Sequence, residues 1–276
     1  MSGPPLPAVT VVVPTFNERD NLPSLAEQVL ALGEHYRLLV VDDNSPDGTG
    51  DLADELASRF PERVTVLHRP AKAGLGRAYV AGLTQALEGR SAFIAQMDAD
   101  HSHGPDDLAR LVAAIDDPAN SYDLVLGSRY IPGGSTVGWP WHRKLVSRGG
   151  GRYAGLVLGV PIRDLTGGFK VWRRETLDAV NLDTIRSDGY SFQIETTWRA
   201  LQHGARVGQI PIAFVDRVAG KSKLSRRVVV EAAVLVWRLR FQGGEGGVRS
   251  GTLTRGVGIG SAPRTGAAPK SGRMRP

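Results

Sequence analysis

The stretch Phe93-Ile94-Ala95-Gln96-Met97-Asp98-Ala99-Asp100 joins a hydrophobic run to two carboxylates that stand one residue apart. The run predicts a buried β-strand, so both acids would lie where that strand leaves the sheet. Carboxylate oxygens at such a place can hold a hard divalent cation and bridge it to a diphosphate, which indicates a nucleotide-sugar site. An isolated Asp-x-Asp is also compatible with a surface turn of solvated acids.

A second acidic pair favours the first interpretation. Asp42 and Asp43 close the earlier apolar run Arg37-Leu38-Leu39-Val40-Val41 in the same way. Because the C-terminal ends of parallel strands meet at one edge of a sheet, repeated acids at strand ends predict a shared functional rim.

Apolar runs and helical segments alternate along the first half of the chain. This alternation predicts an α/β fold, with a mostly parallel central sheet, helices on both faces and right-handed crossovers. Beyond residue 129 the pattern is less regular. The predicted strands are 9–13, 37–41, 64–67, 93–97, 124–126 and 207–215, the last broken by Pro211; one predicted helix ends near residue 32, and the others span 51–59, 76–87, 105–115, 142–158, 190–202 and 225–241.

Composition limits the domain organisation. With 276 residues, 41% of them hydrophobic, the chain can bury one large core, so a single domain followed by a tail is expected. The absence of cysteine favours a reducing, cytoplasmic location. A net charge of +6 favours anionic partners, without distinguishing nucleotides, nucleic acids and acidic lipids. We predict a flexible N-terminus over 1–8 and a disordered basic tail over 243–276, where Gly, Ser, Thr, Pro and Arg dominate.

The first strand runs into Pro14-Thr15-Phe16-Asn17-Glu18 and not into a glycine-rich phosphate loop. A dinucleotide-binding dehydrogenase is therefore disfavoured. Glu18 can accept hydrogen bonds from ribose hydroxyls, and Asp43 can pair with a base edge or a sugar. Helix capping or plain solvation is the alternative for both side chains.

Six motifs between residues 9 and 224 resemble, in order and spacing, those of the dolichol- or polyprenol-phosphate mannosyltransferases. They are Pro14-Thr15-Phe16-Asn17-Glu18, Asp42-Asp43-Asn44-Ser45-Pro46-Asp47-Gly48-Thr49, Met97-Asp98-Ala99-Asp100, Gly127-Ser128-Arg129-Tyr130, Asp164-Leu165-Thr166-Gly167-Gly168-Phe169 and Asp216-Arg217-Val218-Ala219-Gly220-Lys221-Ser222-Lys223-Leu224. The resemblance implies a single Rossmann-like GT-A domain over 9–224. It also implies transfer of mannose from GDP-mannose to a polyprenyl monophosphate with inversion.

Two alternatives to this function are kept. Relatives that make glucosyl or other polyprenyl phosphates share much of the same frame, so a polyprenyl-phosphate glucosyltransferase is one alternative. The other is a non-catalytic nucleotide-sugar-binding subunit that retains the fold, although the intact carboxylates argue against it.

The resemblance also implies roles for individual residues. The guanosine pocket would be lined by Pro14, Phe16, Glu18, Val41 and Asp43. The diphosphate would be met by Asp98, Ala99 and Asp100, of which Asp98 and Asp100 would bind Mg2+ or Mn2+. Ser102 stands where many relatives place a glutamine metal ligand, and Asp188 stands where relatives often carry lysine. The donor and acceptor phosphates would be held by Arg129, Arg217 and Lys223, which with Asp100 form the expected catalytic set; the incoming lipid phosphate would meet Arg143 and Ser147.

The chemistry implied for this family requires no protein nucleophile. A phosphate monoester has a second pKa of about 6, so the acceptor is already anionic at neutral pH and can attack the sugar without a strong general base. The site would instead stabilise negative charge on the departing nucleoside diphosphate. Glu195, on a predicted helix, either orients an acceptor or forms a structural ion pair, and the ion pair is the favoured interpretation.

The apolar stretch 228–237 is too short to cross a bilayer, because a spanning helix needs about 20 residues. Flanking arginines make 225–242 a candidate amphipathic interfacial helix, with packing against the core as the alternative. We expect peripheral attachment to the cytosolic face of a membrane, directly or through an integral membrane partner. Nucleic-acid binding is disfavoured, because the basic tail carries no recognition motif.

Overall fold

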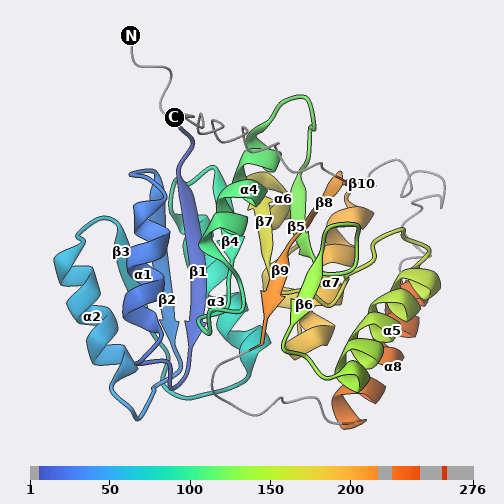
Figure 1. Ribbon diagram of the computed structural model, residues 1–276, viewed down its shortest axis with the longest axis horizontal. Coiled ribbons are helices and arrows are strands. Elements are labelled where there is room, and N and C mark those ends of the chain that lie inside the picture. Colours follow the sequence, from blue (N-terminus) through green and yellow to red (C-terminus); the bar gives the residue numbers. More distant parts are fainter. Residues whose placement is uncertain (1–5, 217–225, 243–256, 260–276) are drawn as a thin grey trace, which may run out of the picture.

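The computed structural model describes residues 6–216, 226–242 and 257–259, and its centre is an eight-stranded sheet (Figure 1). The strand order is β10-β8-β5-β7-β4-β1-β2-β3, and every pairing is parallel except the two made by β7. The strands are β1 Val9–Thr15, β2 Tyr36–Asp42, β3 Val64–His68, β4 Phe93–Gln96, β5 Leu124–Ser128, β7 Lys170–Arg173, β8 Val207–Pro211 and β10 Val257–Ile259; β6 Ser135–Val137 and β9 Ala213–Val215 form a separate parallel pair.

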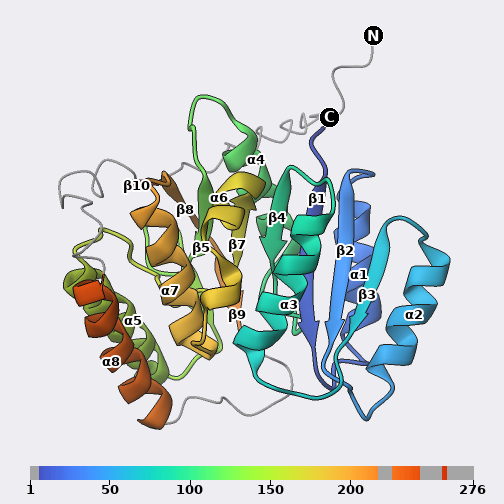
Figure 2. The same cartoon turned by 180° about the vertical axis from the view of Figure 1, so that it is seen from behind.

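Helices cover both faces of the sheet, as Figures 1 and 2 show from opposite sides. Side chains alternate along each strand, so Leu38 and Val40 pack under one helix layer while Leu39 and Val41 pack under the other. This two-sided burial explains the continuous apolar runs. One layer comprises α1 Leu22–Ala31, α2 Thr49–Arg59 and α4 Pro105–Asp116; the other comprises α3 Leu75–Glu88, α6 Arg174–Ala179, the short 3₁₀ helix η1 Leu182–Thr184 and α7 Gly189–Gln202.

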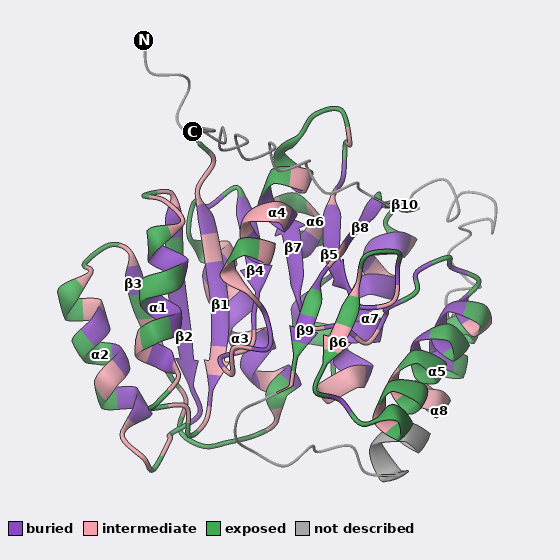
Figure 3. Cartoon of the chain, viewed as in Figure 1, coloured by how far each residue is buried: buried purple, intermediate pink, exposed green. Residues whose placement is uncertain are grey.

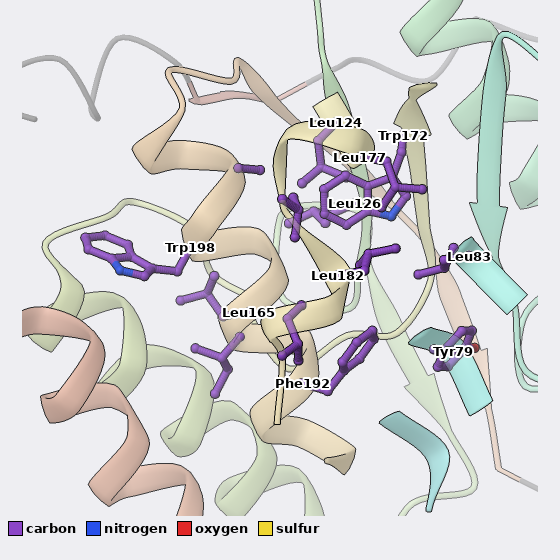
Figure 4. Close-up of a cluster of buried hydrophobic side chains, with 14 of the residues drawn as sticks. Tyr79, Leu83, Leu124, Leu126, Leu165, Trp172, Leu177, Leu182, Phe192 and Trp198 are labelled. Atoms are coloured by element: carbon purple, nitrogen blue, oxygen red, sulfur yellow. The ribbon is translucent and has the colours of Figure 1, made fainter. Parts of the chain in front are cut away.

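The core between the sheet and the second layer is rich in aromatic side chains (Figure 4). Tyr79 of α3 stacks on Phe192 of α7, with ring centroids 5.9 Å apart and planes within 4°. Trp172 of β7 is fully buried, and its indole nitrogen donates a 2.7 Å hydrogen bond to Gln96. The ring stack holds α3 beside α7, and the hydrogen bond joins β7 to β4.

Two further helices, α5 Trp141–Leu158 and α8 Arg226–Gln242, lie beside each other outside α7. From α8, Val236 and Leu239 are buried against the core, while Trp237 is 48% exposed. Most of α5 is exposed (Figure 3). In the part of the chain that the structure describes, no helix combines the length and apolar character needed to cross a bilayer.

The predicted α/β architecture is confirmed, and the differences lie in the second half of the chain. Five elements were not predicted: β6, β7, α6, η1 and β10. The segment expected to be a disordered tail includes β10, which pairs with β8, whereas 243–256 and 260–276 lie outside the described residues.

Candidate functional site

A cavity of about 520 Å³ opens at the C-terminal ends of β1, β2 and β4. It is the rim that the paired acids predicted. Nine of the predicted site residues line it: Pro14, Phe16, Glu18, Asp43, Asp98, Ala99, Asp100, Arg129 and Arg143.

The turn after β4 fixes both carboxylates at the cavity wall. Oδ1 of Asp98 accepts a 2.9 Å hydrogen bond from the Tyr79 hydroxyl, and Oδ1 of Asp100 accepts a 3.1 Å bond from the Ser102 amide. The amide of Asp98 donates to Nδ1 of His103, also at 3.1 Å. An acceptor Nδ1 implies a neutral imidazole protonated at Nε2, and burial lowers the pKa of His103 in agreement. The turn is therefore held by fixed, specific bonds.

The two carboxylates fit a divalent cation. Mg2+ and Mn2+ prefer oxygen ligands, and Mg2+ is commonly bound through one or two carboxylates together with substrate phosphates. Among the described residues, no three or more His, Cys, Asp or Glu side chains are grouped so that they could hold a metal ion together. Asp98 and Asp100 would thus supply the protein ligands, with the remaining positions left to a diphosphate and water.

Arg129 is held by Asp164. Its Nε and Nη2 donate to the two carboxylate oxygens at 2.8 and 2.6 Å, and its amide donates to Oδ2 at 2.9 Å. The two side chains are 5% and 0% exposed. Burial would lower the pKa of Arg129, but the charge and hydrogen bonds of Asp164 outweigh it and raise the pKa. Arg129 is thus permanently cationic and anchors the loop that follows Asp164 to the cavity wall.

One side of the cavity combines an ion pair with a cation–π contact. Asp43 is paired with Arg69, and both side chains are largely buried. Lys72 Nζ lies 3.5 Å from the centre of the Phe16 ring. A buried carboxylate for hydrogen bonding and an aromatic face for stacking suit a nucleobase. Asp42, which precedes Asp43 in the sequence, accepts hydrogen bonds from Ser45 and Thr15 and does not line the cavity.

The other side of the cavity lies at the start of α5. Nη1 of Arg143 donates to Asp216 at 2.7 Å, and the guanidinium lies 3.9 Å from the Trp139 ring centre. Trp139 meets Phe214 edge-on, with centroids 5.3 Å apart. A cation on an aromatic platform suits an anionic group carried on an apolar chain.

Three predicted site residues do not line this cavity. Val41 is fully buried in the core beneath α3, because strand alternation turns its side chain away from the rim. Ser102 is 1% exposed, and its amide donates to Asp100 in the turn after β4. Ser147 lies beside the Tyr130 hydroxyl. Arg217 and Lys223 lie outside the described residues.

Glu195 forms the structural ion pair that was favoured for it. Its Oε1 accepts a 2.5 Å bond from Arg199 one helical turn later, and its Oε2 accepts a 2.6 Å bond from Ser187. It does not line the cavity.

Comparison with known families identifies the chain. The model of the family described as "Glycosyl transferase family 2" matches residues 10–180, which include β1 to β5, the carboxylate turn and β7. The chain belongs to glycosyl transferase family 2. It is an enzyme of the glycosyltransferase class.

Two relatives of this glycosyltransferase match it over most of their length. The polyprenol monophosphomannose synthase of Mycolicibacterium smegmatis is 45% identical over 255 residues, covering 92% of each chain. The undecaprenyl-phosphate mannosyltransferase of Micrococcus luteus is 44% identical over 230 residues, covering 83% of this chain and 93% of the relative. The resemblance to the polyprenol-phosphate mannosyltransferases is confirmed.

Solved structures support the fold of the glycosyltransferase. Glucosyl-3-phosphoglycerate synthase from Mycobacterium tuberculosis, in complex with Mn2+, UDP and glucosyl-3-phosphoglycerate, aligns with a TM-score of 0.63 at 19% identity, covering 85% of this chain and 80% of that one. The same synthase with Mg2+ and UDP gives the same TM-score at 18% identity. The predicted GT-A fold is confirmed.

Sequence patterns missed several lining residues of the glycosyltransferase, including Trp139, Tyr190 and Phe214. Trp139 lies in the loop before α5 and Phe214 in the short strand β9, where no local periodicity marks a shared edge, and Tyr190 is the second residue of α7. Tyr79, which orients Asp98, was missed because it sits on a helical face that reads as ordinary core.

Proposed function

We propose that this glycosyltransferase moves mannose from GDP-mannose to a polyprenyl monophosphate. The observation that carries the proposal is the pair Asp98 and Asp100 facing one cavity, in a chain 44–45% identical to two enzymes named for polyprenyl-type phosphate mannose synthesis. The names of these relatives support a polyprenyl-type phosphate as the acceptor. They do not name the nucleotide of the donor, so GDP is our own addition.

Asp43, Phe16 and Lys72 would bind the nucleoside. Arg69 orients the Asp43 side chain, so that the carboxylate can accept hydrogen bonds from a guanine edge. Asp98 and Asp100 would hold Mg2+ or Mn2+, which when bound offsets negative charge that grows on the leaving diphosphate.

The reaction would be a direct displacement at the sugar C1. An oxygen of the lipid phosphate forms the new bond on one face while the bond to GDP breaks on the opposite face, which inverts the anomeric configuration. The acceptor brings its own negative charge, so the protein needs to position it and not to deprotonate it. Arg143, on its Trp139 platform, is the described cation best placed for that phosphate. Arg217, Lys223 and Ser147 are kept as proposed contacts, the first two outside the described residues.

The lipid would be collected from a membrane surface against α5 and α8. Trp141 at 75%, Leu145 at 64% and Leu156 at 81% expose large apolar groups along α5. This helix carries four lysine or arginine residues and no acidic one, and Trp237 and Phe241 of α8 are exposed beside it. Apolar groups framed by cations suit the interface of an anionic bilayer. The helix also carries Arg143, so membrane contact and acceptor entry would share one end of the cavity. We propose that this is the cytosolic leaflet.

Incubation with GDP-mannose, MgCl2 and a short polyprenyl phosphate tests the function. We expect mannolipid and GDP from the wild type, none from Asp100→Asn, and wild-type turnover from Asp106→Asn, which removes an exposed carboxylate of α4. Turnover with UDP-glucose but not with GDP-mannose would select the glucosyltransferase alternative. GDP binding without turnover on any donor would select the binding subunit.

A further inference from the structure

The carboxylate of Asp188 joins two helices that are far apart in the sequence. It caps α7 by accepting a 2.8 Å hydrogen bond from the Gly189 amide. The same side chain accepts a hydrogen bond from the amide of Gly76, the second residue of α3. Helix N-termini leave backbone amides without partners inside the helix, and one carboxylate here serves two of them.

Two glycines allow this contact. Gly74 has φ of +105°, a conformation that L side chains rarely adopt, and a Cβ there would collide with the Asp188 carboxylate. A Cβ at Gly76 would lie 2.8 Å from the carbonyl oxygen of Ser187 and 2.9 Å from Asp188 Cα. The loop before α3 is thus built for direct contact with the loop before α7. We call the contact among Gly74, Gly76 and Asp188 the α3–α7 clasp.

The clasp lies on the cavity wall. Gly74, Leu75 and Asp188 all line the cavity, and the loop that ends at Gly74 carries Lys72 over the Phe16 ring. Below the clasp, α3 and α7 are joined by the Tyr79–Phe192 stack, and the Tyr79 hydroxyl donates to Asp98. The contacts between α3 and α7 therefore connect Asp188 with the nucleotide side of the cavity and with Asp98, one of the two proposed metal ligands.

The position of the Asp188 carboxylate at two helix N-termini makes it compatible with an anionic donor. A bare carboxylate in this cavity would repel a diphosphate. At the N-termini of α3 and α7, the partial positive charges of both helices offset it. An ordinary N-cap would satisfy its own helix alone, whereas the bond to Gly76 crosses 112 residues of sequence.

We propose that Asp188 is a positioning residue for the nucleotide-sugar donor. By holding the loop 72–75 against α7, it keeps the nucleotide side of the cavity formed before the donor arrives, which lowers the ordering cost of binding. This proposal rests on the proposed function for the identity of the donor.

Three variants separate this role from simple stability. Asp188→Ala removes the acceptor, and Asp188→Asn keeps an acceptor oxygen without the charge. Gly76→Ala leaves the residue at position 188 unchanged but introduces a methyl group that forces the α3–α7 clasp open. Asp183→Ala is the control, because it removes an exposed carboxylate from η1 nearby. Unfolding curves establish that each variant is folded at the assay temperature.

GDP binding with Mg2+, measured by calorimetry, and tryptic cleavage after Lys72 are the readouts, and neither needs turnover. We expect Asp188→Ala and Gly76→Ala to weaken GDP binding about tenfold, the effect of losing roughly one capping interaction, and to speed cleavage after Lys72. Asp188→Asn should lie near the wild type, and KM for the lipid phosphate should stay unchanged in every variant. Wild-type GDP affinity and cleavage in folded Asp188→Ala would overturn the proposal. If the wild type binds UDP and not GDP, the donor assignment fails, and the same comparison with UDP still decides the role of Asp188.

Discussion

The guanidinium of Arg129 and the carboxylate of Asp164 face each other through two parallel hydrogen bonds of 2.8 and 2.6 Å, where neither side chain is more than 5% exposed. Fork-to-fork geometry of this kind offsets the cost of taking both charges out of water. Removing one partner would leave the other charge buried and alone, so the pair ties the integrity of the cavity wall to the stability of the chain.

Asp164→Ala is therefore expected to reduce the free energy of unfolding by about 3–5 kcal/mol, as measured by urea denaturation. Glu27→Ala is the matched control, because it breaks an ion pair with Arg59 whose side chains are 59% and 58% exposed. That change should cost less than about 1 kcal/mol. Equal effects of the two variants would show that the buried pair has no special weight.

Gly82 marks a close approach of α3 to the sheet. A Cβ at this position would lie 2.6 Å from a methyl group of Val12 and 2.6 Å from one of Val41. Gly82→Ala should thus destabilise the fold by about 1–3 kcal/mol through overpacking. An added Cβ at Gly150 in α5 would have no atom within 4 Å other than those of its chain neighbours and of the backbone of its own helix. Gly150→Ala should therefore stabilise the fold by up to about 1 kcal/mol. Thermal unfolding of both variants checks the opposite signs, and stabilisation by Gly82→Ala would contradict the packing described.

Lys170 gives the stability a specific pH dependence. Its ammonium group is fully buried, with hydrogen bonds of 2.8 Å to the Gln193 carbonyl and 3.0 Å to Thr196, and burial holds its pKa well below the ordinary value. Between the folded and the unfolded pKa, unfolding takes up a proton, so the free energy of unfolding rises with pH through this window and is lowest below it.

Lys170→Met should flatten that rise. Urea denaturation of wild type and variant between neutral pH and about pH 10, where an unfolded lysine still titrates, measures the difference in slope. Lys144→Met, at an exposed position of α5, should retain the wild-type slope. A wild-type slope in Lys170→Met would mean that Lys170 does not titrate anomalously.

The exposed apolar groups of α5 should control membrane attachment. The triple change Trp141→Ser, Leu145→Ser, Leu156→Ser is expected to weaken binding to phosphatidylserine vesicles at least about tenfold in a sedimentation assay, with GDP binding unchanged. Leu6→Ser, at a position 62% exposed and outside this surface, is the control. Binding of the wild type should fall as salt is raised, since part of the attraction is electrostatic. Vesicle binding by the triple variant equal to that of the wild type would exclude α5 as the contact.

Sequence patterns predicted the regular half of this fold well, because strands buried on both faces carry uninterrupted apolar runs such as Val9–Val13. They missed β7 because its four residues, Lys170–Arg173, begin and end with a basic side chain and include only two apolar ones. Only the folded structure shows that Gln193 and Thr196 accept the buried ammonium. In the second half of the cavity, Arg129 and Arg143 were predicted, whereas Trp139, Tyr190 and Phe214 were not.

The candidate site divides in the same way. Residues at strand ends, such as Asp43, Asp98 and Asp100, were placed correctly at the rim because parallel strands end together. Val41, which the resemblance implied for the nucleotide pocket, is not among the cavity-lining residues and lies in the core beneath α3. The partners of Asp188 could not be foreseen, because backbone amides of a distant helix leave no mark in a sequence.

The cavity wall consists of two blocks that are separate in chain order. All described lining residues either precede residue 104 or follow residue 126, and α4, which lies between these limits, contributes none. A single crossover within α4 would therefore join the complete first block of one homologue to the complete second block of another. Such a chimaera would have to keep the contacts that span the junction, among them Gly76–Asp188, Tyr79–Phe192 and His103–Phe169.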